Sequence, residues 1–84
     1  MPFATKSYDN GIPYTQTFDN SGGSGGNLPL YVGIAEPGTS KSSPYWKIYK
    51  LTYDGNDAVT DIQWASGNTN MDKTWNNRAN YTYS

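Results

Sequence analysis

The stretch that decides the fold is Tyr45-Trp-Lys-Ile-Tyr-Lys-Leu-Thr-Tyr53, followed by the turn sequence Asp54-Gly-Asn-Asp57. Trp46 and Ile48 lie two positions apart, and this spacing predicts a β-strand with both side chains on one face. Asp-Gly tolerates the positive φ angles of tight hairpin turns, so the chain is expected to reverse at residues 54–57. Residues 58–65 then form the returning strand of a hairpin.

The alternation within the first of these strands is not perfect. Leu51, the next large apolar residue after Ile48, comes three positions later rather than two. A one-residue slip turns every later side chain to the other face unless an extra residue is accommodated. We therefore expect a β-bulge near Tyr49–Lys50 that brings Leu51 and Tyr53 to the same core as Trp46.

The segment before this hairpin predicts another strand. Residues 28–34 alternate, with Leu30, Val32 and Ile34 on one face. Glu36-Pro-Gly-Thr39 follows as a type II turn, in which the proline sets the first central angle and the glycine takes the positive φ.

The segment after the hairpin changes its period. Met71, Thr74, Trp75 and Arg78 fall at positions i, i+3, i+4 and i+7, which predicts a short helical turn near residues 70–78 with Asn70 as its cap. Residues 80–84 are expected to form a last strand.

Residues 1–27 differ in character from the rest. They end in the Gly/Ser-rich run of residues 21–27, and such runs behave as flexible coil. Residues 12–18 have the pattern of a short strand, which Pro13 would restrict to a sheet edge. We interpret residues 1–27 as an extended N-terminal arm ending in a hinge, and residues 28–84 as a β domain.

The expected fold is therefore all-β. It is a small β-sandwich or partly open β-barrel with one short helical turn near residues 70–78 and an extended N-terminal arm. The chain has 84 residues, which allows one small domain only.

Composition excludes several kinds of chemistry. The chain has no Cys and no His, so thiolate nucleophiles, disulfides, zinc–thiolate sites and a histidine general base are absent. The net charge of −1 argues against a nucleic-acid partner, because phosphate neutralisation supplies most nonspecific affinity. No apolar run approaches the ~18 residues of a membrane span, and the first eight residues lack the apolar stretch of a signal peptide.

Two weaker signals predict no site. Asn68, Asn70 and Asp72 have the alternate spacing of a calcium loop, but Lys73 and Ala79 stand where that loop needs Gly and Glu. Glu36 is the only Glu, and no pattern pairs it with an aspartate in an apolar cleft. We therefore expect no catalytic residue, no metal and no cofactor, and the protein is not expected to be an enzyme.

Aromatic residues supply most of the large apolar surface. Thirteen rings accompany only nine Val, Ile and Leu residues, so Trp46, Trp64 and Trp75 are expected to form the core. Exposed rings would suit either a subunit interface or the stacking of sugar rings or nucleobases, and alternation alone does not separate these. The residues we select as interface candidates are Tyr14, Phe18, Tyr31, Tyr45, Tyr49, Arg78, Tyr81 and Tyr83. For Arg78 we expect stacking on a ring or pairing with a carboxylate such as Asp72 or Asp61.

About two thirds of the chain resembles a group of short proteins encoded among the virion structural genes of tailed bacteriophages. The resemblance lies in residues 30–38, 46–54 and 59–67 and, most specifically, in Met71-Asp-Lys-Thr-Trp-Asn-Asn-Arg-Ala-Asn-Tyr-Thr-Tyr-Ser84. Residues 1–27 take no part in it.

The resemblance implies a virion component that decorates a capsid or belongs to a tail or fibre. The expected partners are other virion proteins and further copies of the chain, and the expected location is the virion, after synthesis in the host cytoplasm. The alternative is a carbohydrate-binding or adhesion module with exposed Tyr and Trp faces, whose partner would be a glycan. Neither hypothesis includes a nucleic-acid or membrane partner.

Overall fold

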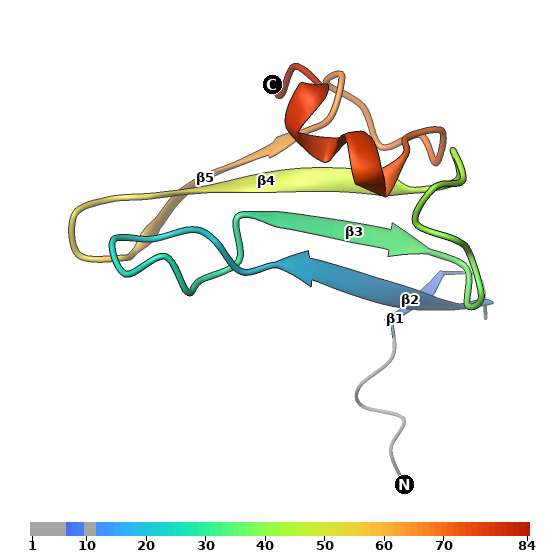
Figure 1. The fold of residues 1–84 in the computed structure, drawn as a ribbon, viewed down its shortest axis with the longest axis horizontal. Helices are drawn as coiled ribbons and strands as arrows, with labels where there is room; N and C mark the ends of the chain where they lie inside the picture. Colours follow the sequence, from blue (N-terminus) through green and yellow to red (C-terminus); the bar gives the residue numbers. More distant parts are fainter. Residues whose placement is uncertain (1–6, 10–11) are drawn as a thin grey trace, which may run out of the picture.

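A computed structural model describes residues 7–9 and 12–84 of the chain. Its centre is an antiparallel sheet of four consecutive strands: β2 (Ile12–Asp19), β3 (Tyr31–Ala35), β4 (Lys47–Tyr53) and β5 (Val59–Trp64). The short β1 (Ser7–Asp9) pairs with the beginning of β2, and the strands lie side by side in sequence order (Figure 1). The all-β fold class is confirmed.

The sheet is single and open, and its second layer is the C-terminal segment. The 3₁₀-helix η2 (Trp75–Asn80) lies over β4, near the C-terminus (Figure 1). The expected helical turn is therefore present, but it begins at Trp75 instead of Asn70. Lys73 is extended and exchanges two backbone hydrogen bonds with Trp46, of 2.8 and 2.9 Å, so the helix cannot begin before it. The backbone N–H of Asn70 donates to Asn68, and Thr74 precedes the helix without a side-chain cap.

The hairpin predicted from residues 45–65 is confirmed, but the predicted position of its bulge is wrong. The pairs Tyr49–Trp64 and Leu51–Ile62 are in regular register, and the shift falls between Thr52 and Tyr53. Leu51 therefore lies on the face opposite Ile48, because successive side chains of an unbroken strand alternate. Leu51 did not need the core of Ile48, since the other face of the sheet also carries apolar residues.

Both predicted turns are present. Thr39 donates its backbone N–H to the carbonyl oxygen of Glu36 at 3.2 Å, and Gly38 has a φ of 87°, as a type II turn requires. In the hairpin turn the residue with positive φ is Asp57, at 62°. The carboxylate of Asp54 accepts the N–H groups of Asn56 and Ala58, which fixes this turn.

The structure also differs from the interpretation of residues 1–27 as an arm. Residues 15–19 of β2 pair with residues 31–35 of β3, so this part of the chain belongs to the sheet. The Gly/Ser run closes the β2–β3 connection: Gly22 and Leu28 exchange two backbone hydrogen bonds of 2.7 and 3.0 Å. Residues 23–26 form the turn between them, with positive φ at Gly23 and Gly26. Residues 1–6 and 10–11 of the predicted arm lie outside the described residues.

The core lies between the sheet and the C-terminal segment. The rings of Trp46 and Trp75 are buried with their centroids 6.3 Å apart, and Ile48, Ala35 and Ala65 complete the buried cluster. Gly33 lies beneath both indoles: a Cβ at this position would come within 2.6 Å of Trp75 and 3.1 Å of Trp46. Two of the three tryptophans thus form the core as predicted, whereas Trp64 is only half-buried on the other face.

We expect Gly33→Ala to destabilise the protein by about 1–3 kcal/mol, because the added methyl group has to displace buried indole rings. Gly55→Ala is the matched control, since its Cβ would meet no atom within 4 Å, and we expect a change within about 0.5 kcal/mol. Urea unfolding followed by tryptophan fluorescence measures both. Equal stability of the two variants would contradict the packing described here.

Candidate interaction surface

The face of the sheet opposite the Trp46–Trp75 core carries a row of apolar residues across four strands. The register pairs Phe18 with Val32, Val32 with Tyr49, and Tyr49 with Trp64. We call this side the open face; strand alternation assigns to it Tyr14, Gln16, Phe18, Val32, Ile34, Lys47, Tyr49, Leu51, Ile62 and Trp64.

The middle of the row is packed and its β2 end is exposed. Val32 is 2% exposed and Phe18 is 50% exposed, while Trp64 at the β5 end is half-buried beside Ile62, which is 52% exposed. The rings of Tyr49 and Trp64 meet edge to face with their centroids 5.1 Å apart. Desolvation raises the pKa of Tyr49, with a smaller contribution from the neighbouring Tyr53. The contact between the Tyr49 and Trp64 rings therefore fixes their positions, so this part of the surface is formed before any partner binds.

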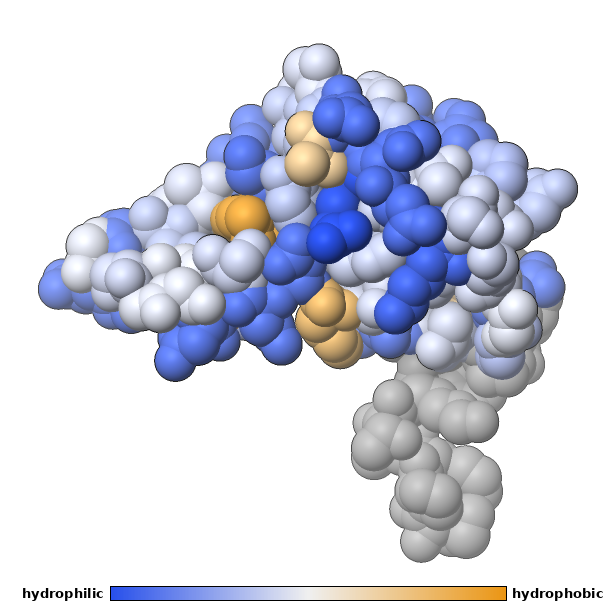
Figure 2. Space-filling model, viewed as in Figure 1, coloured by the Kyte–Doolittle hydropathy of each residue, from blue (hydrophilic) through white to orange (hydrophobic). Residues whose placement is uncertain are grey.

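Charge is sparse on the open face. Of the residues assigned to it, only Lys47 is charged, and its ammonium lies 5.7 Å from the centroid of the Tyr14 ring. In the view of Figure 2, hydrophobic residues are few and are separated by hydrophilic ones. A partner of the open face therefore has few charges to desolvate.

Four of the eight interface candidates lie on the opposite side of the sheet from the open face or in the C-terminal segment. Tyr31 and Tyr83 pack together with their ring centroids 5.5 Å apart, and Tyr81 also contacts the core cluster. Desolvation, together with the nearby Tyr31 and Tyr81, raises the pKa of Tyr83. The Tyr83 hydroxyl donates to the carbonyl oxygen of Arg78, and the Tyr81 hydroxyl accepts the N–H of Thr74.

Arg78 stacks on a ring, as predicted, and pairs with a carboxylate that was not predicted. Its guanidinium lies 4.6 Å from the Trp75 ring centroid, and its Nε donates to Asp19 at 2.9 Å. A hydrogen bond from Ser21 lowers the pKa of Asp19, and Arg78 lowers it further. The ion pair links η2 to the end of β2, 59 residues earlier. The predicted partners Asp72 and Asp61 lie elsewhere, Asp72 bonding to Lys73 and Asp61 lying on β5.

The remaining candidate, Tyr45, lies apart from the open face. It is 63% exposed and lines a pocket of about 340 Å³ together with Glu36, Thr39 and Met71. The pocket joins the loop after β3 to the segment before η2. Among the described residues that line it there is one ring, one carboxylate and no basic side chain.

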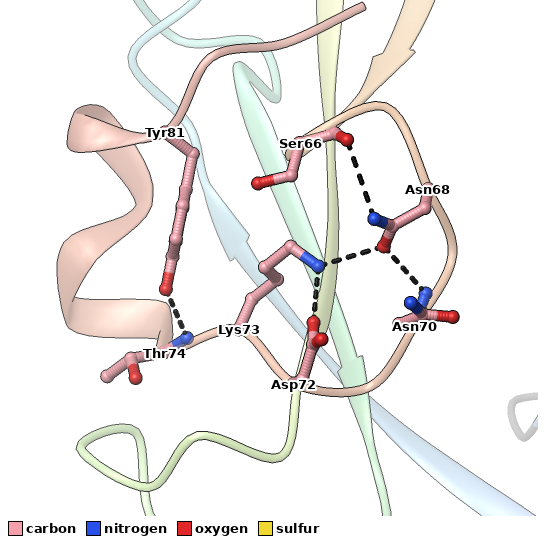
Figure 3. Close-up of polar contacts among 7 residues, drawn as sticks. All are labelled: Ser66, Asn68, Asn70, Asp72, Lys73, Thr74 and Tyr81. Atoms are coloured by element: carbon pink, nitrogen blue, oxygen red, sulfur yellow. Dashed lines mark hydrogen bonds and ion pairs between the residues drawn. The ribbon is translucent and has the colours of Figure 1, made fainter.

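The residues with calcium-loop spacing, Asn68 and Asp72, bind the side-chain ammonium of Lys73. Lys73 is only 4% exposed, and its Nζ donates to the side-chain oxygen of Asn68 at 2.9 Å and to the carboxylate of Asp72 (Figure 3). The Asn68 oxygen also accepts the N–H of Asn70. Lys73 thus closes the loop between β5 and η2, a role that the sequence analysis missed. Among residues 7–9 and 12–84, no group of three His, Cys, Asp or Glu side chains is placed to hold a metal.

Ile62 and Trp64 were not predicted as surface candidates. The alternation of the 58–65 strand already placed both on one face. Which face remained uncovered could not be read from alternation, because it depends on the side to which the C-terminal segment folds. In the described part of the chain, no helix has the length and apolar character needed to span a bilayer.

We expect the Asp19–Arg78 pair to make stability dependent on pH in acid. Because the pKa of folded Asp19 is below the ordinary ~3.9, its contribution is complete above that pH and is lost as the pH falls through the folded value. Asp19→Asn should cost about 1 kcal/mol at pH 7, and the difference from wild type should shrink below about pH 4. Thermal unfolding from pH 2 to 7 tests this, with exposed Glu36→Gln as control. A difference that is independent of pH would contradict it.

We expect Lys73→Met to destabilise the protein by about 1–3 kcal/mol, because the buried stem is preserved while two hydrogen bonds of the ammonium are lost. Lys41→Met, at an exposed position, should change the unfolding free energy by less than about 0.5 kcal/mol. Amide hydrogen exchange should show the loss first in residues 66–72. Unchanged protection of this loop would refute the role of Lys73.

Comparisons of the chain with protein-family models, with curated proteins and with solved structures find no match.

Proposed function

We propose that this protein is a structural component that docks in multiple copies on a larger assembly through the open face of its sheet. The row Phe18–Val32–Tyr49–Trp64 carries the proposal, because it gives four strands one continuous apolar surface, and among the residues assigned to the open face only Lys47 is charged. Interface cores are enriched in aromatic residues and depleted in charge in the same way. The assembly we propose is the virion of a tailed bacteriophage, on the strength of the sequence resemblance.

The size of the open face favours many weak contacts over one strong contact. Four strands about 4.8 Å apart and about seven residues long, at ~3.4 Å each, span roughly 450 Å² of flat area. A standard stable interface buries about 800 Å² on each partner. One copy therefore binds weakly by this face alone, and stable attachment requires repeated copies or additional contacts.

A second candidate function is carbohydrate binding, and the Tyr45 pocket is the observation that favours it. Tyr45 exposes 63% of its surface beside the carboxylate of Glu36, in a pocket of about 340 Å³. An exposed ring can stack on the apolar face of a sugar, while a carboxylate accepts hydrogen bonds from its hydroxyl groups. This site is separate from the open face, so the two functions can be tested by different variants.

The docking proposal predicts that Phe18→Lys reduces incorporation of the protein into phage particles at least tenfold, because docking would bury an unpaired charge. Tyr45→Lys, an equal charge change at an exposed ring away from the open face, should incorporate like the wild type. Quantitative mass spectrometry of purified particles measures the copies retained, and circular dichroism confirms that both variants fold. Wild-type protein missing from the particles, or equal incorporation of both variants, would overturn the proposal.

The carbohydrate alternative predicts the reverse dependence. Saturable binding on a glycan array should disappear in Tyr45→Ala and persist in Phe18→Lys. Absence of binding to every glycan by the wild type would remove this alternative and leave the docking proposal untouched.

A further inference from the structure

Besides the open face, the sheet has an outer edge at β5, where a strand of another chain could pair. β5 pairs with β4 on one side. The N–H of Ala65 donates to the carbonyl oxygen of Ile48 at 2.9 Å, which shows which backbone groups of β5 point toward β4. Backbone groups of an antiparallel strand point alternately to its two neighbours. Ile62 and Trp64 therefore direct their N–H and C=O groups away from β4.

The composition of β5 would favour pairing at this edge. Its sequence, Val-Thr-Asp-Ile-Gln-Trp, is rich in β-formers and contains one charged residue. Val59 and Ile62 are 51% and 52% exposed. An edge of this kind is a template for a second chain unless something blocks it.

The chain itself engages the outward N–H groups of Ile62 and Trp64. Trp64 exchanges two backbone hydrogen bonds with Ser84, of 3.0 and 3.2 Å, so the C-terminal residue covers this end of the edge. The N–H of Ile62 donates to the carboxylate of its own neighbour, Asp61, at 3.0 Å. An incoming strand would have to displace both contacts.

The other end of the edge is irregular. The register shift opposite Thr52 and Tyr53 leaves Thr60 as an extra residue in β5, and its hydroxyl donates to the carbonyl oxygen of Thr52 at 3.3 Å. A bulge disturbs the even spacing of outward groups that a new strand needs. The regular part of the outer edge is thus short and centred on Ile62, beside Asp61.

We propose that Asp61, together with the C-terminal Ser84, prevents β5 from pairing with β5 of a second copy of the chain. Asp61 acts in two ways. Its carboxylate accepts the Ile62 N–H, which is the donor that a second strand would need. Its charge also opposes its own copy: a register that pairs Ile62 with Ile62 of the second copy places the two Asp61 side chains on the same face as diagonal neighbours, about 7–8 Å apart, and like charges at that distance repel.

This inference goes beyond the proposed function, because it concerns the sheet edge and stands whether or not the open face docks. Its consequence is that copies of the protein do not extend one another's sheets. Copies are kept from associating at β5 before they reach an assembly, while the open face stays accessible.

The test is a series of substitutions at the exposed Asp61, measured by sedimentation equilibrium. Asp61→Thr removes the charge and replaces the carboxylate with a hydroxyl, a weaker acceptor on a shorter side chain, and should strengthen self-association about tenfold or more. Asp61→Asn retains an acceptor without the charge and should give an intermediate effect. Asp61→Lys restores like-charge repulsion without the acceptor and should associate less than Asp61→Thr. Each effect should persist in the Phe18→Lys background, which separates the edge from the open face.

Amide exchange locates the new contact. In Asp61→Thr, the Ile62 amide should become protected as the concentration rises, and Asp61→Asn supports the same measurement if the threonine variant does not fold. Association of these variants no stronger than that of wild type, or protection that appears away from residues 59–63, would overturn the proposal. Association of Asp61→Asn equal to that of Asp61→Thr would overturn the part assigned to the Ile62 hydrogen bond.

Discussion

The packing of two indole rings against β3 at Gly33, where no side chain keeps them away, is the contact on which the rest of the structure depends. Gly33 lets Trp75 and Trp46 approach the sheet, and the chain has no disulfide and few aliphatic residues to replace them. Burial of one such ring is worth about 4–6 kcal/mol before entropic costs, which is comparable to the whole net stability of a small domain. Where these rings lie therefore decides which face of the sheet is covered.

The covered face in turn decides where a partner can bind. The C-terminal segment adds Tyr81 and Tyr83 to the same side as Trp75, and Arg78 fastens it to Asp19 on the far strand. Residues 14–84 place no such layer over the row of apolar residues on the opposite side. The molecule thus presents one open face, and its β5 edge is engaged by the chain's own groups at Asp61 and Ser84.

Local sequence signals predicted the elements well and their relative placement poorly. The 45–65 hairpin and the Pro37-Gly38 turn followed from alternation and turn chemistry, which act within a few residues. The bulge was misplaced because Leu51 was assumed to need the same core as Ile48. The pairing of β2 with β3 was missed because a run rich in glycine also supplies the positive φ angles of an ordered turn. Asp19–Arg78 and Lys73–Asn68 depend on tertiary placement, which periodicity does not encode.

The turns that end the two hairpins also touch each other. Ser24, in the β2–β3 connection, donates its N–H and its hydroxyl to the carboxylate of Asp57 in the β4–β5 turn, at 2.8 and 3.1 Å. These two hydrogen bonds connect the β2–β3 hairpin to the β4–β5 hairpin outside the β-ladder. Opening of either turn therefore breaks contacts of the other, so the two turns at the end of the sheet far from the C-terminal layer are coupled.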